Sequence, residues 1–125
     1  MGQKIGSSLI GGEIIALSGN LGAGKTTFVQ GLAVGLGIKS KIVSPTFILM
    51  RSYKAAKLNL YHVDLYRLEG DVKKEVTNLG LNDTWGRKEN IVVIEWAEKI
   101  NNMLPKNTRW IKFKALESGY HEIIY

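Results

Sequence analysis

The most informative segment of this chain is Gly19-Asn20-Leu21-Gly22-Ala23-Gly24-Lys25-Thr26. It fits the pattern G-x-x-x-x-G-K-[ST], in which a glycine-rich turn between a strand and a helix holds phosphate groups with its backbone N–H groups. Glycine allows backbone conformations that a Cβ would block, the lysine ammonium group faces the β- and γ-phosphates, and the threonine hydroxyl suits Mg²⁺. The residues that we expect to bind ATP are Asn20, Leu21, Gly22, Ala23, Gly24, Lys25, Thr26 and Thr27.

The segments on either side of this loop have the patterns that such a motif requires. An apolar run, Ile14–Ser18, precedes the loop and predicts a buried strand. Apolar residues recur at fourfold spacing over Thr26–Leu36, which predicts a helix that ends at Gly37. Gly31 and Gly35 lower the intrinsic stability of that helix.

The rest of the chain predicts short strands and helices. The expected strands are 47–53, 58–63, 91–96, 110–116 and 121–125. The short connection 54–57 predicts a hairpin for the first two, and 121–125 is a candidate partner of 110–116. The expected helices are 71–79, capped by Asp71, and 98–104. Together these elements predict an α/β fold over residues 1–125: a single-domain P-loop NTPase with a mixed, partly antiparallel central sheet flanked by helices.

Composition excludes several classes of protein. The 125 residues are 45% hydrophobic and 22% charged, which is ordinary for one globular domain. No cysteine is present, so disulfides and thiol catalysis are excluded, and two histidines make a histidine-built metal site unexpected. No apolar run approaches the roughly 20 residues of a membrane span, and no signal peptide pattern is present. We expect a soluble cytoplasmic protein.

The net charge of +6 is carried by the first half of the chain. Residues 1–60 hold seven basic residues and one acidic residue, whereas residues 61–125 hold ten of each. This bias favours polyanionic partners such as a nucleotide, tRNA or an acidic protein. The basic residues stand singly, so the sequence permits direct tRNA binding without predicting it.

Two predicted strands end in a carboxylate that could serve a metal ion beside the phosphates. Glu95 follows the apolar run 91–94, and Asp64 ends the run 60–63. ATP hydrolysis needs a carboxylate near Mg²⁺ and a group that orients water, but spacing does not say which acid does which. Thr46, in Ser44-Pro45-Thr46-Phe47, offers a hydroxyl that could reach Mg²⁺ or the γ-phosphate, although a plain turn before a strand also explains this segment.

Three further side chains receive no catalytic role from the sequence. Trp85 and Trp96 are interpreted as core or rim aromatics, and His62 as a satisfied strand histidine.

Four blocks of sequence together resemble a known family. The segments 22–28, 44–47, 62–67 and 93–98 occur in the order found in the bacterial TsaE family, the ATPase of tRNA threonylcarbamoyladenosine biosynthesis. The resemblance runs from about Gly2 to the C-terminus. It implies a compact P-loop ATPase that works with the TsaD and TsaB proteins, while the threonylcarbamoyl group is transferred to the tRNA adenosine next to the anticodon. ATP hydrolysis is implied to reset the complex.

The resemblance also implies roles for individual residues. Thr26 and Glu95 match the magnesium-binding positions. Asp64 and Thr46 match residues near the γ-phosphate, and with Lys25 they form the expected catalytic set. Trp96 matches a tryptophan beside the site.

Two departures from the family pattern accompany this match. The family has a further N-terminal strand with a threonine, and this chain begins inside that region, so one adenine-side contact is expected to be missing. Near the end, where the family commonly has an arginine, the chain has Tyr120 and His121.

Two other functions fit the loop alone. One is a small-molecule kinase, which would need an acceptor pocket and a lid. The other is a nucleotide-gated binding module without turnover.

Overall fold

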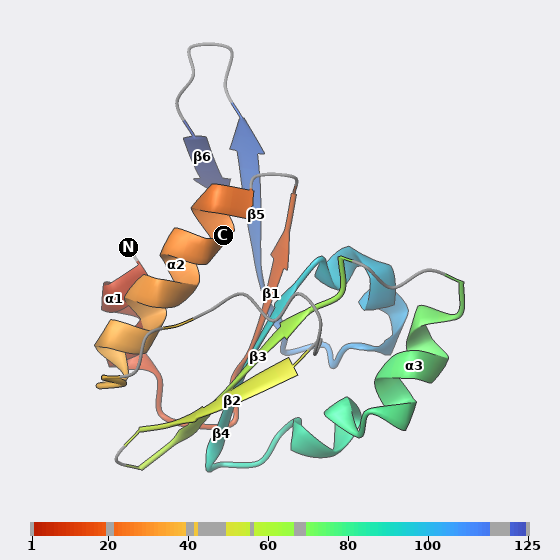
Figure 1. Cartoon of the computed structure of the whole chain (residues 1–125), viewed down its shortest axis with the longest axis horizontal. Helices are drawn as coiled ribbons and strands as arrows, with labels where there is room; N and C mark the ends of the chain where they lie inside the picture. Colours follow the sequence, from red (N-terminus) through yellow and green to blue (C-terminus); the bar gives the residue numbers. More distant parts are fainter. Residues whose placement is uncertain are drawn as a thin grey trace.

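Six strands form one mixed sheet in the computed structural model of the chain (Figure 1). The structure describes residues 2–19, 22–39, 42, 50–55, 57–66, 70–115 and 121–124. The strands are β1 (Ile14–Ser18), β2 (Met50–Lys54), β3 (Asn59–Asp64), β4 (Asn90–Glu95), β5 (Arg109–Ala115) and β6 (His121–Ile124). The helices are α1 (Gly2–Ser8), α2 (Gly22–Gly35) and α3 (Val72–Asn78), with the 3₁₀ helices η1 (Leu81–Thr84) and η2 (Ala97–Met103).

The sheet has the order β2-β3-β4-β1-β5-β6 and confirms the predicted mixed architecture. The inner strands β3, β4, β1 and β5 run parallel, while β2 and β6 pair antiparallel to the strands beside them. The predicted hairpin of β2 and β3 is therefore present, and β6 is the partner of β5, as the sequence suggested. Parallel strands bring their carboxyl ends to the same edge of the sheet, where ligands of open α/β sheets bind.

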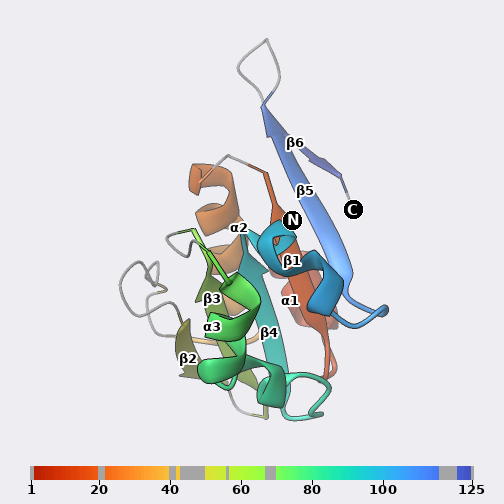
Figure 2. The same cartoon turned by 90° about the vertical axis from the view of Figure 1, so that its right-hand side faces the viewer.

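Helices cover both faces of the sheet (Figures 1 and 2). α1 and α2 pack on one face over a core that includes Leu17, Leu32 and Val93. α3 and η2 pack on the other face over a second core that includes Ala16 and Ile94. Neighbouring residues of β1 and β4 thus point into different cores, and β4 is buried along its whole length. This explains why the two strands read as continuous apolar runs.

Helix α1 was not predicted from the sequence. It packs so closely on α2 that a Cβ at Gly6 would overlap the carbonyl oxygen of Leu32, and a Cβ at Gly35 would overlap that of Gln3. The glycines that weaken α2 in isolation are therefore the ones that let a second helix approach its backbone. The cost in helix propensity is offset by burial between the two helices, which includes Ile5.

Helix α2 begins at Gly22 rather than at Thr26, so the predicted start was four residues late. The motif predicts a loop at Gly22 and Gly24, but the structure places both in the first turn of α2, where the backbone N–H groups have no partner within the helix. The predicted stop at Gly37 is confirmed. This residue has φ +82°, and the amides of Gly37 and Ile38 donate to the carbonyls of Val34 and Ala33, which closes the end of the helix.

The remaining elements lie close to their predicted positions. Asp71 caps α3 as expected, because its Oδ1 accepts a hydrogen bond from the amide of Lys74 at 3.1 Å. The segment predicted as helix 98–104 forms the 3₁₀ helix η2, and η1 was not predicted. None of the described helices is both long and apolar enough to cross a bilayer.

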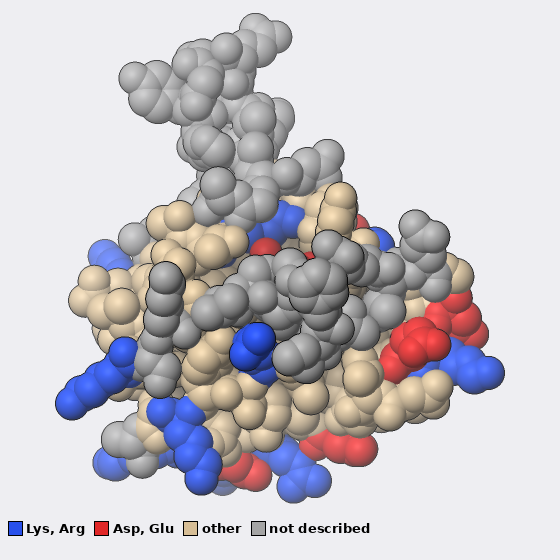
Figure 3. Space-filling model, viewed as in Figure 1, with Lys and Arg blue, Asp and Glu red and all other residues tan. Residues whose placement is uncertain are grey.

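Some of the basic residues of the first half lie around the turn between β2 and β3. Arg51, Lys54 and Lys57 are exposed there, and basic side chains gather at this end of the molecule (Figure 3).

Candidate functional site

The candidate site lies at the carboxyl edge of the parallel strands. β1 leads into the glycine-rich stretch, and α2 carries Lys25 in its first turn. Asp64 ends β3 and Glu95 ends β4, and the two residues are partners in the register of these neighbouring strands. The structure thus brings together Lys25, Asp64 and Glu95, which the sequence had singled out from separate segments.

Parts of the predicted site lie outside the described residues. These are Asn20 and Leu21 of the loop, and Thr46 with its Ser-Pro segment. Thr26 is half-buried and Thr27 exposed in α2. The binding and catalytic roles given to all of these residues stay predictions.

The first residue of the motif can only be glycine. Gly19 has φ +105°, and a Cβ there would overlap the backbone carbonyl of Phe113 on β5. The loop therefore leaves β1 pressed against the neighbouring strand in a conformation that L side chains rarely adopt. The amide of Gly19 donates to Oε2 of Glu98 at 3.3 Å. Sequence reasoning missed this contact, because Glu98 lies 79 residues further along the chain.

Lys25 is the most unusual side chain of the site. It is fully buried, and its Nζ has no hydrogen-bond partner within the described part of the chain. The ammonium group lies 4.1 Å from the ring centre of Trp96, over the face of the indole. Burial lowers the pKa of Lys25, opposed by the negative charges of Glu95, Glu98 and Asp64. A buried cation without a bonded acceptor marks a place where an anionic ligand can bind.

Asp64 is held half-buried beside this cation. Its Oδ1 accepts a hydrogen bond from the amide of Tyr66 at 2.9 Å. Burial raises the pKa of Asp64, the hydrogen bond from Tyr66 opposes the increase, and the charge of Glu95 adds to it. Asp64 is therefore a better proton acceptor than an exposed aspartate, which suits a group that faces a reacting water.

Glu95 makes its contact with a residue that the sequence left out of the site. Oε2 of Glu95 lies 2.5 Å from Nε2 of His62, and both side chains are buried. The other ring nitrogen, Nδ1, has no partner among the described residues. The interpretation of His62 as a satisfied strand histidine therefore holds for one nitrogen only. The sequence did contain one signal that His62 lies at the site. Residues two apart in a strand point to the same face, so His62 shares a face of β3 with Asp64.

Trp96 packs against the core and also contacts Lys25 in the candidate site. It is half-buried, and it is the one non-glycine residue with positive φ, at 60°, within the described chain. Its ring lies 5.2 Å from that of Tyr66, whose carbonyl oxygen accepts a hydrogen bond from Nζ of Lys99 at 2.9 Å. The left-handed backbone turns the indole onto Lys25 directly after β4.

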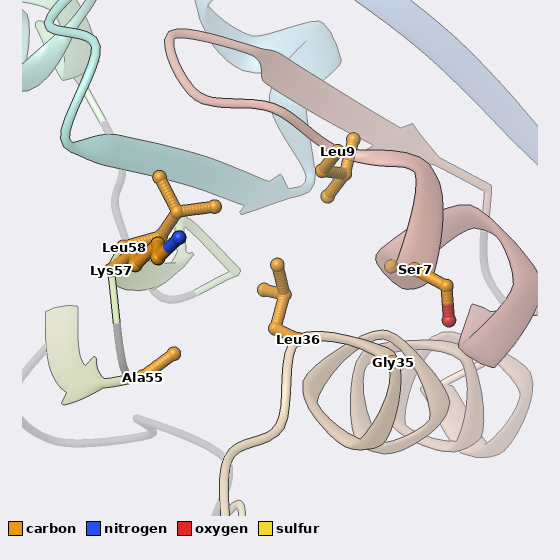
Figure 4. A pocket seen from close by; sticks show the side chains of 8 residues that line it. Ser7, Leu9, Gly35, Leu36, Ala55, Lys57 and Leu58 are labelled. Atoms are coloured by element: carbon orange, nitrogen blue, oxygen red, sulfur yellow. The ribbon is translucent and has the colours of Figure 1, made fainter.

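A cavity of about 220 Å³ lies at the other end of α2. Leu9, Leu36 and Leu58 line it together with Lys57, and it opens between α1, the end of α2 and the turn after β2 (Figure 4). Its lining is mainly apolar, and it is separate from the carboxylates of the candidate site.

Replacing Asp64 by asparagine is expected to stabilise the folded protein at neutral pH. The raised pKa means that the folded state binds the proton of Asp64 more tightly than the unfolded chain does. Ionisation therefore removes stability as pH rises through the raised pKa, and none is removed below the usual value of 3.8. Asparagine keeps the acceptor for Tyr66 without the charge. The melting temperature of Asp64→Asn should exceed that of the wild type at pH 7, and the difference should vanish below pH 3.8.

Asp71→Asn is the matched control for this experiment. It makes the same chemical change at an exposed helix cap, where asparagine serves as well as aspartate. An Asp64→Asn variant that is less stable than the wild type at pH 7 would show that the carboxylate is not strained by its surroundings.

The geometry defines a class of protein. A buried central strand, a glycine whose backbone conformation is required, and a helix with a buried lysine in its first turn meet at the carboxyl edge of a parallel sheet, which is the organisation typical of phosphate-loop proteins. The family model described as "Threonylcarbamoyl adenosine biosynthesis protein TsaE" matches residues 1–123, and the chain belongs to this family. The family resemblance noted from the sequence is therefore confirmed.

Similar proteins agree with this assignment. The chain is 48% identical over 103 residues to the tRNA threonylcarbamoyladenosine biosynthesis protein TsaE of Nostoc sp., covering 80% of this chain and 62% of that protein. It is 41% identical over 123 residues to the protein of that name from Treponema pallidum, covering 98% and 87% respectively. A crystal structure of Bacillus subtilis YdiB superposes with a TM-score of 0.76 at 33% identity, covering 98% of this chain and 72% of that one. The chain thus spans less than two thirds of the Nostoc relative.

Proposed function

We propose that this protein is a cytoplasmic, Mg²⁺-dependent ATP-binding and ATP-hydrolysing component of tRNA threonylcarbamoyladenosine biosynthesis that works with TsaD and TsaB. One observation carries the proposal: Nζ of Lys25, at the start of α2 and beside the carboxylates that end β3 and β4, is buried with no acceptor among the residues that the structure describes. A triphosphate supplies the oxygens that this ammonium group lacks, and the helix N-terminus favours the same negative charge. The partners follow from the family alone.

The donor set also fits Mg²⁺. Carboxylate and hydroxyl oxygens are the ligands this ion prefers, and in nucleotide sites it takes one or two from the protein and the rest from phosphates and water. Glu95 and Thr26 would hold it. The described residues form no group of three or more acidic, histidine or cysteine side chains that could hold a metal ion. The ion would neutralise the charge on the phosphate oxygens.

Phosphate binding and hydrolysis are assigned to separate residues of the site. Lys25 would hold the β- and γ-phosphates, with the face of Trp96 keeping water from one side of the ammonium group. Asp64 would hydrogen-bond the attacking water and accept its proton as the water oxygen bonds to the γ-phosphorus and the bond to ADP breaks. The raised pKa of Asp64 supports that role. Thr46 is proposed to contact the γ-phosphate. No arginine finger is identified, so we expect slow hydrolysis until a partner completes the site.

Replacing Glu95 by glutamine is expected to weaken the dependence on Mg²⁺. Glutamine keeps the shape and one acceptor oxygen but loses the charge that attracts the ion. Loss of an outer-shell group costs about 10–100-fold in metal affinity, and a direct ligand should matter at least as much. The Mg²⁺ concentration for half-maximal binding of a fluorescent ATP analogue should therefore rise by about tenfold or more, while binding in EDTA stays unchanged.

Glu89→Gln makes the same substitution at an exposed position just before β4 and should behave as the wild type. Equal Mg²⁺ dependence in Glu95→Gln and Glu89→Gln would remove Glu95 from the metal site.

The activity and partners are tested separately. With γ-labelled ATP, label should appear as free phosphate; label on a metabolite would instead support a small-molecule kinase. In a pull-down with purified TsaD and TsaB, retention of the protein should depend on ATP. Retention that ignores both ATP and the Lys25→Ala substitution would contradict a nucleotide-controlled role in that complex.

A further inference from the structure

We infer that His62 is a positioning residue, which fixes the carboxylate of Glu95 so that one of its oxygens stays aimed at the metal ion; this rests on the proposed function. Nε2 of His62 and Oε2 of Glu95 lie 2.5 Å apart. A carboxylate can only accept a hydrogen bond, so the proton between them belongs to Nε2. The histidine is the donor, and Oε1 of Glu95 is left for another partner.

The sheet explains why these two side chains meet. His62 on β3 is the register partner of Val93 on β4, and Glu95 lies two residues further along the same face of β4. Asp64 is a second acidic residue near the imidazole. It lies two residues beyond His62 on β3, close enough for an electrostatic interaction with the ring. The imidazole thus lies near both acidic residues of the site, at the carboxyl edge of the sheet.

Burial shows that packing alone does not explain a histidine here. The side chain is fully buried in the same sheet as the apolar Leu60 and Val93, and its Nδ1 has no partner among the described residues. An apolar residue at this position would avoid the cost of removing an imidazole from water. The polar contact that compensates is the one to Glu95.

The consequence for the metal site is geometric. A glutamate side chain without a second contact can rotate about its terminal bond, so both oxygens would sample several directions. A hydrogen bond to Oε2 holds the carboxylate plane and leaves Oε1 preorganised. Partners of this kind orient metal-ligating groups, and their loss costs about 10–100-fold in metal affinity.

Two substitutions separate positioning from packing. His62→Gln places an amide N–H close to the position of Nε2, whereas His62→Asn places it close to that of Nδ1, too short to reach Glu95. We expect the Mg²⁺ concentration for half-maximal binding of a fluorescent ADP analogue to rise about tenfold or more in His62→Asn and less than about threefold in His62→Gln. Binding in EDTA should not change in either variant. Leu60→Ala, which removes buried packing from the same strand, controls for loss of stability and should keep the wild-type Mg²⁺ dependence.

The outcomes distinguish the two proposals. A wild type without any Mg²⁺ dependence contradicts the proposed function itself. A wild type that depends on Mg²⁺, with both histidine variants unchanged or both weakened equally, contradicts only the role of His62.

A measurement on the unmodified protein keeps the test independent of whether the variants fold. The chain has two histidines, so ¹⁵N spectra of the imidazole rings resolve His62 from His121. We expect His62 to carry its proton on Nε2, with slow exchange of that proton with water. A proton on Nδ1, or rapid exchange between both forms, would overturn the inference.

Discussion

Replacing Lys25 by methionine is expected to abolish nucleotide binding while raising the melting temperature of the protein. The buried ammonium group has no acceptor among the described residues, and burial lowers its pKa, so its charge destabilises the folded protein as long as no anionic ligand contacts it. Methionine keeps the unbranched stem and the helix propensity without that charge. Removing one partner of a buried charge pair costs about 2–5 kcal/mol, so affinity for ATP should fall by about 30- to 5,000-fold. Lys25→Ala should lose binding equally.

The pH dependence of the stability gain follows from the direction of the pKa shift. The unfolded chain binds the proton of Lys25 more tightly than the folded one, so the cost to stability is full below the lowered pKa and shrinks as pH rises through it toward the usual value of 10.5. The difference in melting temperature between Lys25→Met and wild type should shrink accordingly in alkaline buffer. Calorimetry over pH and titration of a fluorescent ATP analogue check the two halves of this prediction.

Lys73→Met is the matched control, because Lys73 is exposed on α3. It should change neither ATP affinity nor the pH dependence of stability. Wild-type affinity in Lys25→Met would refute the phosphate site, and a large loss of stability would show that the ammonium group is already satisfied in the apo protein.

Much of the sheet could be predicted because its two central strands, β1 and β4, are buried on both faces. Ile14–Ser18 and Asn90–Glu95 are apolar runs bounded by turn residues, and such runs have few other places in an α/β domain. Helix α1 could not be predicted in this way, because Gly2–Ser8 contains two glycines and has weak helix propensity. It forms because Gly2 and Gly6 on one helix and Gly31 and Gly35 on the other allow the backbones to touch. In both segments the glycines are four residues apart, and this spacing was the sequence signal for two closely packed helices.

Some residues of the candidate site could likewise be predicted from the sequence and others could not. Lys25 follows from the motif, and Asp64 and Glu95 from their position at strand ends, so each could be found from its own segment. Their common location required the strand order, which the sequence does not state. His62 and Glu98 were missed because their contacts, with Glu95 and with the amide of Gly19, cross between distant segments. Pair contacts of this kind have no local pattern.

Asp64→Asn is expected to stop turnover while leaving ATP binding intact. Asparagine can still accept the hydrogen bond from the amide of Tyr66, so the end of β3 should keep its conformation. It removes a negative charge from beside the phosphates, so affinity for ATP should stay within about threefold of wild type or increase. It cannot accept a proton from water, and loss of a general base costs about 10²–10⁴-fold in rate.

Single-turnover release of phosphate from a preformed complex with ATP measures this loss without interference from binding. Asp71→Asn should release phosphate at the wild-type rate. Because the same Asp64 substitution is expected to raise the melting temperature, a drop in rate cannot be attributed to unfolding: the variant should be more stable, bind its nucleotide and fail to hydrolyse it. A residue kept at the expense of stability has the behaviour of a functional group. Undiminished phosphate release from Asp64→Asn would move the water-activating role to Thr46 or to a partner protein.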